Sequence, residues 1–209
     1  MVYSVDIYDK KGKVVSTVDL NEDIFADGNV NESLIHEYVI LQASNARHNI
    51  ACTKGRGEIA GSGRKIFKQK GTGNARAGDR NSPVRKGGGV AFGPRGERNF
   101  EKAMNKKARR NALMGIITLK AKDKALLGLK DFDLTEPKTK DLLDIVKNIG
   151  IEGKKALFVL GSKNQNIEKS LRNIANVKYI TVGYLNPLDV MSASKVVFFE
   201  TALQAINSK

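Results

Sequence analysis

The 209-residue chain has no tryptophan, one cysteine and only two histidines. Cys52 cannot form a disulfide within the chain, which favours a reducing compartment such as the cytoplasm. His36, His48 and Cys52 make a poor metal set, because structural zinc usually takes four such ligands. Without tryptophan, any stacking on nucleic-acid bases falls to phenylalanine, tyrosine, histidine or arginine.

The sequence also lacks a run of 18 apolar residues, so we expect no membrane-spanning helix. Residues 1–7 alternate between apolar and polar as a strand does, and they lack the charged and apolar regions of a signal peptide. With 41% hydrophobic residues, the chain can build one α/β core that carries an insertion. We therefore expect a cytoplasmic protein in which residues 1–209 form a single α/β domain.

Residues 53–98 depart from this ordinary composition. Twelve of these 46 residues are glycine and twelve are basic, against three acidic residues, so the local net charge is +9. Residues 99–110 add five basic residues and one acidic residue, which brings residues 53–110 to +13 of the chain's +14. Glycine loses much backbone entropy on ordering and buries no side chain, so this segment cannot form a core.

Three features favour a contact surface for nucleic acid over a flexible electrostatic tail. The segment is internal, so both of its ends are anchored. Apolar residues such as Phe67 and Phe92 are interspersed with the cations and can stack against bases. Glycines beside the cations let the bare backbone approach phosphates closely. We predict an extended basic loop at residues 47–100 that binds RNA or DNA, with its tip between Gln69 and Arg80.

The predicted contacts are cations that neutralise phosphates and two phenylalanines that pack against bases or sugars. In the loop they are Lys54, Arg56, Arg64, Lys65, Phe67, Lys68, Lys70, Arg76, Arg80, Arg85, Lys86, Phe92, Arg95 and Arg98. A second basic group opens the helix expected after the loop and would meet another nucleic-acid segment: Lys106, Lys107, Arg109 and Arg110.

Outside the loop, hydrophobic periodicity predicts alternating strands and helices. Strands are expected at residues 2–8, 14–20, 125–127, 156–160, 177–182 and 195–199. Helices are expected at residues 32–46, from about 105, at 137–148, at 166–174 and from 201. Asn31 is the expected N-cap of the first helix, and Asn186-Pro187 is expected to be a turn. The alternation predicts a three-layer α/β/α domain with a mostly parallel sheet and helices on both faces.

Catalytic motifs are weak. Residues 71–76 resemble the start of a dinucleotide fingerprint, but the third glycine is absent and no strand precedes it. A nucleophilic pair of His48 and Cys52 is conceivable, although no third residue is present to orient it. The alternative to a binding protein is a nucleic-acid-modifying enzyme whose α/β domain binds a nucleotide. A pocket with convergent polar groups at the carboxyl ends of the strands would favour that alternative. We predict no catalytic residues, no cofactor and no metal.

Several segments closely resemble one known family. They are residues 61–65 (GSGRK), 68–76 (KQKGTGNAR), 82–83 (SP), 87–95 (GGGVAFGPR), 105–109 (NKKAR) and 137–140 (PKTK). The chain is similar in these segments to the bacterial large-subunit ribosomal protein L-four family, and the resemblance spans the full length. The family usually has tryptophan at the position of Phe67 and arginine at that of Asn74.

The resemblance implies a structural, non-enzymatic protein of the large ribosomal subunit, with its loop threaded into 23S rRNA. It further implies early entry into subunit assembly, contact with neighbouring ribosomal proteins and, in some members, repression of the operon through the mRNA leader. The loop tip is implied to lie at the narrow part of the peptide exit tunnel, near the nascent peptide. Carried over by position, the tip consists of Gln69, Lys70, Gly71, Thr72, Gly73, Asn74, Ala75 and Arg76.

Overall fold

The computed structural model describes residues 3–22, 24–26, 28 and 30–208. By internal packing, the chain separates into two compact units. The α/β unit comprises Met1–Ala43 and Ala103–Lys209, and the loop unit comprises Ser44–Lys102. The predicted loop at residues 47–100 falls within the loop unit.

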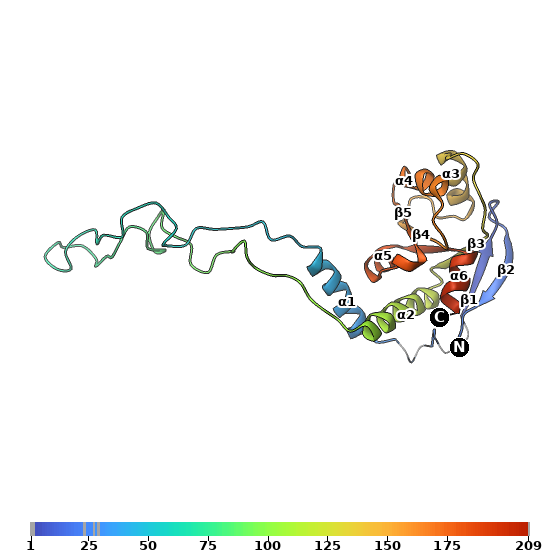
Figure 1. Ribbon diagram of the computed structural model, residues 1–209, viewed down its shortest axis with the longest axis horizontal. Coiled ribbons are helices and arrows are strands. Elements are labelled where there is room, and N and C mark those ends of the chain that lie inside the picture. Colours follow the sequence, from blue (N-terminus) through green and yellow to red (C-terminus); the bar gives the residue numbers. More distant parts are fainter. Residues whose placement is uncertain (1–2, 23, 27, 29, 209) are drawn as a thin grey trace. The chain divides into compact units, whose positions relative to one another are not determined.

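The α/β unit is built around one six-stranded sheet (Figure 1). In spatial order its strands are β2 (Val14–Asp19), β1 (Ser4–Tyr8), β3 (Leu126–Leu129), β6 (Lys195–Phe199), β4 (Ala156–Leu160) and β5 (Val177–Thr181). The β1–β2 pair is antiparallel and all other neighbouring pairs of described strands are parallel, which confirms the predicted mostly parallel sheet. The first strand was predicted from Val2, which lies outside the described residues.

The burial of the strands follows from their composition. All five residues of β4 are buried because the strand is a continuous apolar run, and the four apolar residues of β6 that follow Lys195 are buried too. The edge strand β2 is mostly exposed. The turn that joins it to β1 contains Gly12, whose φ of 73° favours glycine, and a side chain there would also collide with the carbonyl of Asn148.

Helices cover both faces of the sheet, as predicted. The described helices are α1 (Glu32–Asn45), α2 (Lys106–Lys122), α3 (Thr139–Asn148), α4 (Gln165–Arg172), α5 (Pro187–Ser192), α6 (Glu200–Asn207) and the 3₁₀ helix η2 (Val182–Tyr184). The connections from β3 through α3 to β4 and from β4 through α4 to β5 run toward the β5 edge of the sheet. The connection from β5 through α5 to β6 runs in the opposite direction. Right-handed crossovers therefore place α3 and α4 on one face and α5 on the other, where α2 packs against α5.

Two asparagines show how the sequence starts helices. Asn31 Oδ1 accepts a hydrogen bond from the backbone N–H of Leu34 at 3.0 Å, which confirms the predicted cap of α1. The turn predicted at Asn186-Pro187 is wrong, because these residues begin α5. Asn186 Oδ1 accepts from the N–H of Asp189 at 2.9 Å, and Pro187 occupies the first helical turn. Proline suits a turn and a helix start equally well, since neither position needs its missing N–H.

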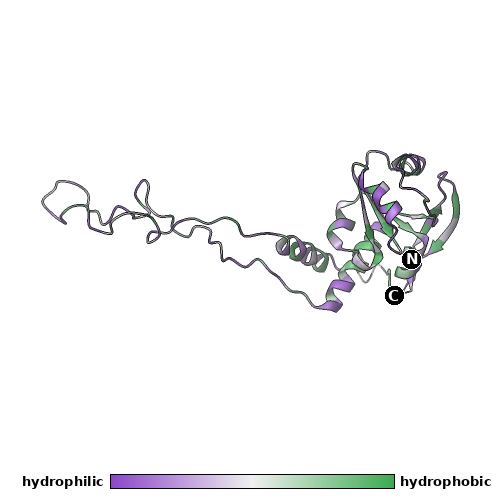
Figure 2. Ribbon diagram, turned by 45° about the horizontal axis from the view of Figure 1, so that its top comes forward, coloured by the Kyte–Doolittle hydropathy of each residue, from purple (hydrophilic) through white to green (hydrophobic). Residues whose placement is uncertain are grey.

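The hydrophobic core belongs to the α/β unit. Leu129, Phe158 and Val197 are fully buried on the central strands, and Ile116 is fully buried on α2. Residues 44–102, all of them described, contribute no buried apolar residue. The hydropathy colouring of Figure 2 concentrates the hydrophobic positions on the strands of the sheet. No helix in the described part of the chain is long and apolar enough to cross a membrane.

Replacing residues 53–98 by a short flexible linker is expected to leave the free energy of unfolding of the α/β unit almost unchanged. The removed residues bury no apolar side chain, and loop length enters the closure entropy only logarithmically. A short linker suffices, because Asn49 Nδ2 lies 3.0 Å from the carbonyl oxygen of Arg98. Urea denaturation of both proteins measures the effect. A loss above about 2 kcal/mol would mean that the loop unit supports the core. In the full chain we also expect rapid amide exchange confined to residues 53–98.

Candidate nucleic-acid interface

Residues 46–105, all of which the structure describes, contain no helix or strand, as the loss of periodicity predicts. They form two limbs that run in opposite directions alongside each other. The Thr53 N–H donates to the carbonyl of Pro94 at 3.0 Å, and the Ile66 N–H donates to the carbonyl of Gly78 at 3.1 Å. The chain therefore reverses within residues 67–77. The eight predicted tip residues fall inside this reversal, and their place against a tunnel stays a prediction.

Asparagine side chains join the limbs near their base. Asn45 Nδ2 donates to the carbonyl of Lys102 at 3.1 Å, and Asn45 Oδ1 accepts from the Lys102 N–H at 2.8 Å. Asn49 Nδ2 donates to the carbonyls of Arg95 and Arg98 at 2.6 Å and 3.0 Å. These bonds satisfy backbone groups that two irregular limbs cannot pair in a β ladder. Neither asparagine was predicted from the sequence, because this residue is common in loops of every kind.

Four charged residues fasten the limbs farther out, and we call them the clasp: Arg56, Glu58, Asp79 and Arg95. Arg56 Nη2 lies 3.0 Å from Asp79 Oδ2, and Arg95 Nη1 lies 2.6 Å from Glu58 Oε1. The Asp79 side chain is only 8% exposed, and its Oδ1 is buried without a hydrogen-bond partner among the described residues. Two cations predicted as phosphate ligands, Arg56 and Arg95, are thus also cross-limb contacts. The Arg95–Glu58 pair is exposed on both sides, so solvent screens it more strongly than the Arg56–Asp79 pair.

The pKa of Glu58 is lowered from its ordinary value, first by the hydrogen bond from the Gly55 N–H and then by Arg95. Because the pKa of Glu58 in the folded loop is depressed, the Glu58–Arg95 pair is complete above the ordinary glutamate value of about 4.3 and weakens as the pH falls through the folded value. In Arg95→Gln the Glu58 titration midpoint should rise but stay below its ordinary value, since the Gly55 N–H remains. An NMR titration of the Glu58 carboxyl measures both midpoints. A wild-type midpoint at or above the ordinary value would contradict the bond.

The remaining loop cations fall into two groups. Lys65 and Arg98 have partners within the loop: Lys65 Nζ donates to Gln69 Oε1 and the Ala77 carbonyl, and the Arg98 guanidinium lies 5.1 Å from the Phe100 ring centre. The other eight have no side-chain hydrogen bond, ion pair or ring contact among the described residues, and we call them the open cations: Lys54, Arg64, Lys68, Lys70, Arg76, Arg80, Arg85 and Lys86. Clustered, unneutralised cations on an irregular loop favour a polyanionic partner.

The loop glycines were predicted to let the backbone approach phosphates. At some of these positions glycine instead lets two backbone segments of the loop unit pack closely against each other. A side chain at Gly89 would collide with the backbone of Arg56, and one at Gly88 would collide with the carbonyl of Ser82. By contrast, Gly71 and Gly73 face open space and adopt φ of 84° and 69°, so the tip turns rely on their conformational freedom.

The two predicted stacking phenylalanines differ in exposure. Phe67 is half-buried, whereas Phe92 is fully exposed in a left-handed backbone conformation with φ of 53°. Hydrogen bonds flank Phe92 on both sides, from the Val90 N–H to the Lys54 carbonyl and from the Thr53 N–H to the Pro94 carbonyl. A bulky residue with positive φ is strained, and such strain is frequent at binding sites.

The second basic group lies at the start of α2, within the α/β unit. Lys106, Lys107, Arg109 and Arg110 occupy its first two turns, and the first turn holds no acidic residue. Cations at a helix N-terminus oppose the positive end of the helix dipole, so their gathering there favours an anionic partner. Arg109 and Arg110 also line a cavity of about 360 Å³ together with residues of α1 and α2.

A small cavity of about 280 Å³ lies at the carboxyl ends of β3, β4 and β6, where the enzyme alternative needs a ligand pocket. Its polar lining is engaged in structural bonds. Asp131 accepts from the N–H and Oγ1 of Thr201, and Asp133 Oδ1 accepts from Asn164 Nδ2 at 3.1 Å. Two carboxylates would also repel a phosphate. This cavity therefore does not favour nucleotide chemistry. The described residues contain no group of three or more His, Cys, Asp or Glu that would hold a metal ion.

Comparison with known proteins gives one consistent result. The model of the ribosomal protein L4/L1 family matches residues 18–209. Similar proteins include the large ribosomal subunit protein uL4 of Syntrophus aciditrophicus, 39% identical over 96% of this chain and 91% of the relative. The uL4 proteins of Geotalea uraniireducens and Christiangramia forsetii are each 40% identical. The alignments cover 97% and 98% of this chain and 96% and 98% of the respective relatives.

Proposed function

Because this chain belongs to the ribosomal protein L4/L1 family, we propose that it is a structural, non-catalytic component of the large ribosomal subunit that binds 23S rRNA through the loop unit. The observation that best supports rRNA binding is the set of eight open cations on the two limbs. Two of the three acidic residues within residues 53–98, Glu58 and Asp79, are already paired in the clasp and do not neutralise these cations. An RNA backbone supplies the missing negative charge along the length of both limbs.

The residues have separate roles in this proposal. The open cations neutralise phosphates, while the clasp and the basal asparagines hold the limbs in register for them. Phe67 and Phe92 pack against bases or sugars, and the basic start of α2 meets a second rRNA segment. The tip at residues 69–76 lines the peptide exit tunnel near the nascent peptide. Neighbouring ribosomal proteins are further partners, and the protein's own mRNA leader is a regulatory one. The site of action is the cytoplasmic ribosome.

Cross-linking the protein to RNA in cells and sequencing the bound RNA tests the assignment. The expected result is one dominant partner, 23S rRNA, with cross-links concentrated at the loop unit. Cross-links spread over unrelated RNAs without enrichment of rRNA would overturn it. Recovery of the protein's own mRNA leader as a minor species would support the regulatory role.

Lys70→Glu is expected to leave subunit assembly largely intact while it reduces sensitivity to macrolide-type drugs that lodge in the tunnel. Lys70 is an open cation within the reversal at residues 67–77, and the remaining open cations still anchor the limbs. A reversed charge at the tip would displace the adjacent rRNA backbone. Growth inhibition and drug affinity for purified mutant ribosomes measure the effect, with Lys163→Glu on the exposed surface of the α/β unit as control. Unchanged sensitivity in ribosomes that contain the Lys70 variant would place this residue away from the tunnel.

A further inference from the structure

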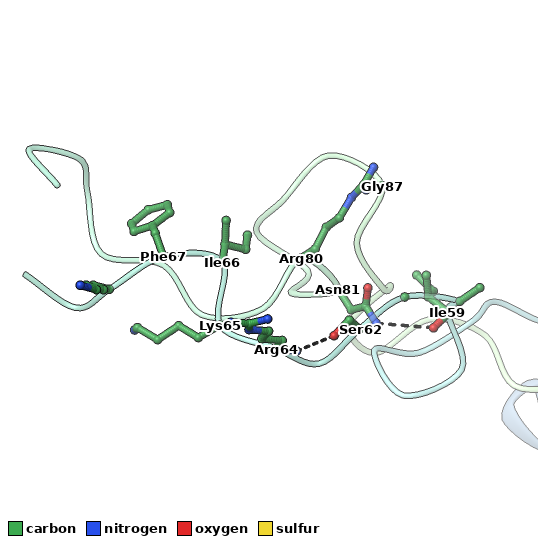
Figure 3. A pocket seen from close by; sticks show the side chains of 12 residues that line it. Ile59, Ser62, Arg64, Lys65, Ile66, Phe67, Arg80, Asn81 and Gly87 are labelled. Atoms are coloured by element: carbon green, nitrogen blue, oxygen red, sulfur yellow. Dashed lines mark hydrogen bonds between the residues drawn. The ribbon is translucent and has the colours of Figure 1, made fainter.

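The loop unit contains a cavity of about 920 Å³ near the tip (Figure 3). The first limb contributes residues 59–62 and 64–68, and the second contributes Arg80, Asn81 and Gly87. Its volume lies toward the upper end of the range of small-molecule sites, roughly 300–1,000 Å³. Four of the described residues that line it are cations and none of them is acidic. The occupant that this lining favours is therefore an anion larger than phosphate alone.

One wall is apolar. Ile66 is 44% exposed and Phe67 is half-buried, in a unit that has no buried apolar residue. In Figure 3 the side chains of Ile66, Phe67 and Arg80 extend to the same side of the loop. An apolar and aromatic surface beside a guanidinium matches the two parts of a nucleotide, whose base has a π face and whose phosphate is anionic.

The cations of the lining differ in availability. Lys65 Nζ is held by Gln69 Oε1 at 2.6 Å and by the Ala77 carbonyl at 3.1 Å, so this residue braces the tip. Arg64, Lys68 and Arg80 are open cations. Arg80 shares the side of the apolar wall and comes from the opposite limb, which makes it the side chain placed to receive a phosphate while the base lies on Phe67.

Asn81 shows that the cavity is built by the loop itself. It is 8% exposed, and with the Asp79 side chain of the clasp it is a buried polar group of the loop unit. Its carbonyl accepts from the Gly89 N–H at 3.0 Å, and its Nδ2 lies 3.5 Å from the Ile59 carbonyl. Gly61 lies directly against the Asn81 amide, where any larger residue would collide with it. Asn81 thus fixes the first limb to the second at the floor of the cavity before any ligand arrives.

We propose that this cavity receives a single unpaired RNA nucleotide, with its base against Ile66 and Phe67 and its phosphate at Arg80. The proposal rests on the proposed function and deepens it, since it converts one stretch of a general phosphate-binding loop into a site for one particular nucleotide. A base inside a duplex cannot present its face to the wall, so the nucleotide must be looped out or single-stranded.

The test uses the full chain and the large-subunit rRNA transcribed from the same organism, with affinity measured over a series of salt concentrations. Phe67→Ala should weaken binding about 5- to 150-fold with no change in salt slope, because it removes stacking and no charge. Phe67→Trp should bind at least as tightly as wild type. Arg80→Gln should flatten the salt slope by about 0.7. Val84→Ala is the matched control, because Val84 is also an apolar residue of the loop unit but is 94% exposed and lies outside the cavity.

A second measurement locates the occupant. A photo-reactive benzoylphenylalanine at position 67 should cross-link to one rRNA nucleotide. In chemical probing of the RNA, that nucleotide should be protected when wild-type protein is bound and reactive again when the Phe67→Ala variant is bound. Cross-links scattered over many nucleotides, a cross-link to protein alone, or wild-type affinity in Phe67→Ala would each overturn the nucleotide site while salt-dependent rRNA binding persists. If the wild-type chain itself shows no salt-dependent binding of this RNA, the proposed function fails together with the site.

Discussion

Replacing six open cations by glutamine is expected to reduce RNA affinity to the level of non-specific binding, a Kd of roughly 10⁻⁴–10⁻⁶ M at physiological salt. The six are Arg64, Lys68, Lys70, Arg76, Arg80 and Arg85. Each phosphate contact contributes about 0.7–0.9 to the slope of log K against log salt, so the slope should flatten by about 4 to 5. The clasp is unchanged in this variant, so the limbs keep their register. The loss of RNA affinity then results from the removed charges alone. RNA titrations at several salt concentrations measure both quantities.

A control with the same net charge separates the loop from charge in general. Six exposed lysines of the α/β unit serve for it: Lys122, Lys130, Lys140, Lys154, Lys155 and Lys163. Both six-residue variants lower the formal net charge from +14 to +8. The control should keep most of the wild-type affinity and salt slope. Equal losses in the two variants would show that the protein binds RNA through its overall charge and that the loop unit is not the main contact surface.

Phe158→Ala is expected to destabilise the α/β unit by about 3–5 kcal/mol. Phe158 is 0% exposed at the middle of β4, which pairs with β5 on one side and β6 on the other. Its truncation leaves a cavity, because the hydrogen-bonded strands cannot move together to fill the space. That loss is a large part of the roughly 5–15 kcal/mol by which a domain is usually stable. The midpoint of urea denaturation, followed by far-ultraviolet circular dichroism, measures the change.

The same substitution at an exposed phenylalanine provides the control. Phe92→Ala removes a ring that is fully exposed in the loop unit, and the free energy of unfolding should change by no more than about 0.5 kcal/mol. Under conditions in which Phe158→Ala remains folded, its salt slope for RNA should equal that of wild type, because the open cations are unchanged. A comparable destabilisation by the two variants would mean that the core is not confined to the α/β unit.

Much of the fold could be predicted because its signals are local. The strands predicted at residues 156–160 and 195–199 are β4 and β6 as observed. The continuous apolar run at 156–160 suits a strand that is buried on both faces and needs no alternation. Asn31 caps α1 through a hydrogen bond to Leu34, which lies only three residues farther along the chain. The start of α5 at Asn186-Pro187 was mistaken for a turn, because the two structures begin with the same local chemistry and only the packing after Pro187 distinguishes them.

The candidate site was predictable in composition and unpredictable in arrangement. Charge and glycine content marked residues 53–98 as a polycationic loop, and no side-chain pattern in that stretch has a period from which contacts could be calculated. The pairing of Arg56 with Asp79 joins residues 23 apart, and that of Glu58 with Arg95 joins residues 37 apart. Such pairings depend on where the chain reverses, and hence on the register of the two limbs.

The sequence by itself therefore determined that this protein has an α/β core, that it carries one internal basic loop, and to which family it is similar. Each of these depends on residue types and on spacings of a few positions. Only the tertiary structure decided which cations are open and which are held in the clasp, and that Asn81 and Phe67 line one cavity. Two residues distant in the chain meet only when both limbs are placed, and a linear sequence carries charge without the distances that decide which charges neutralise each other.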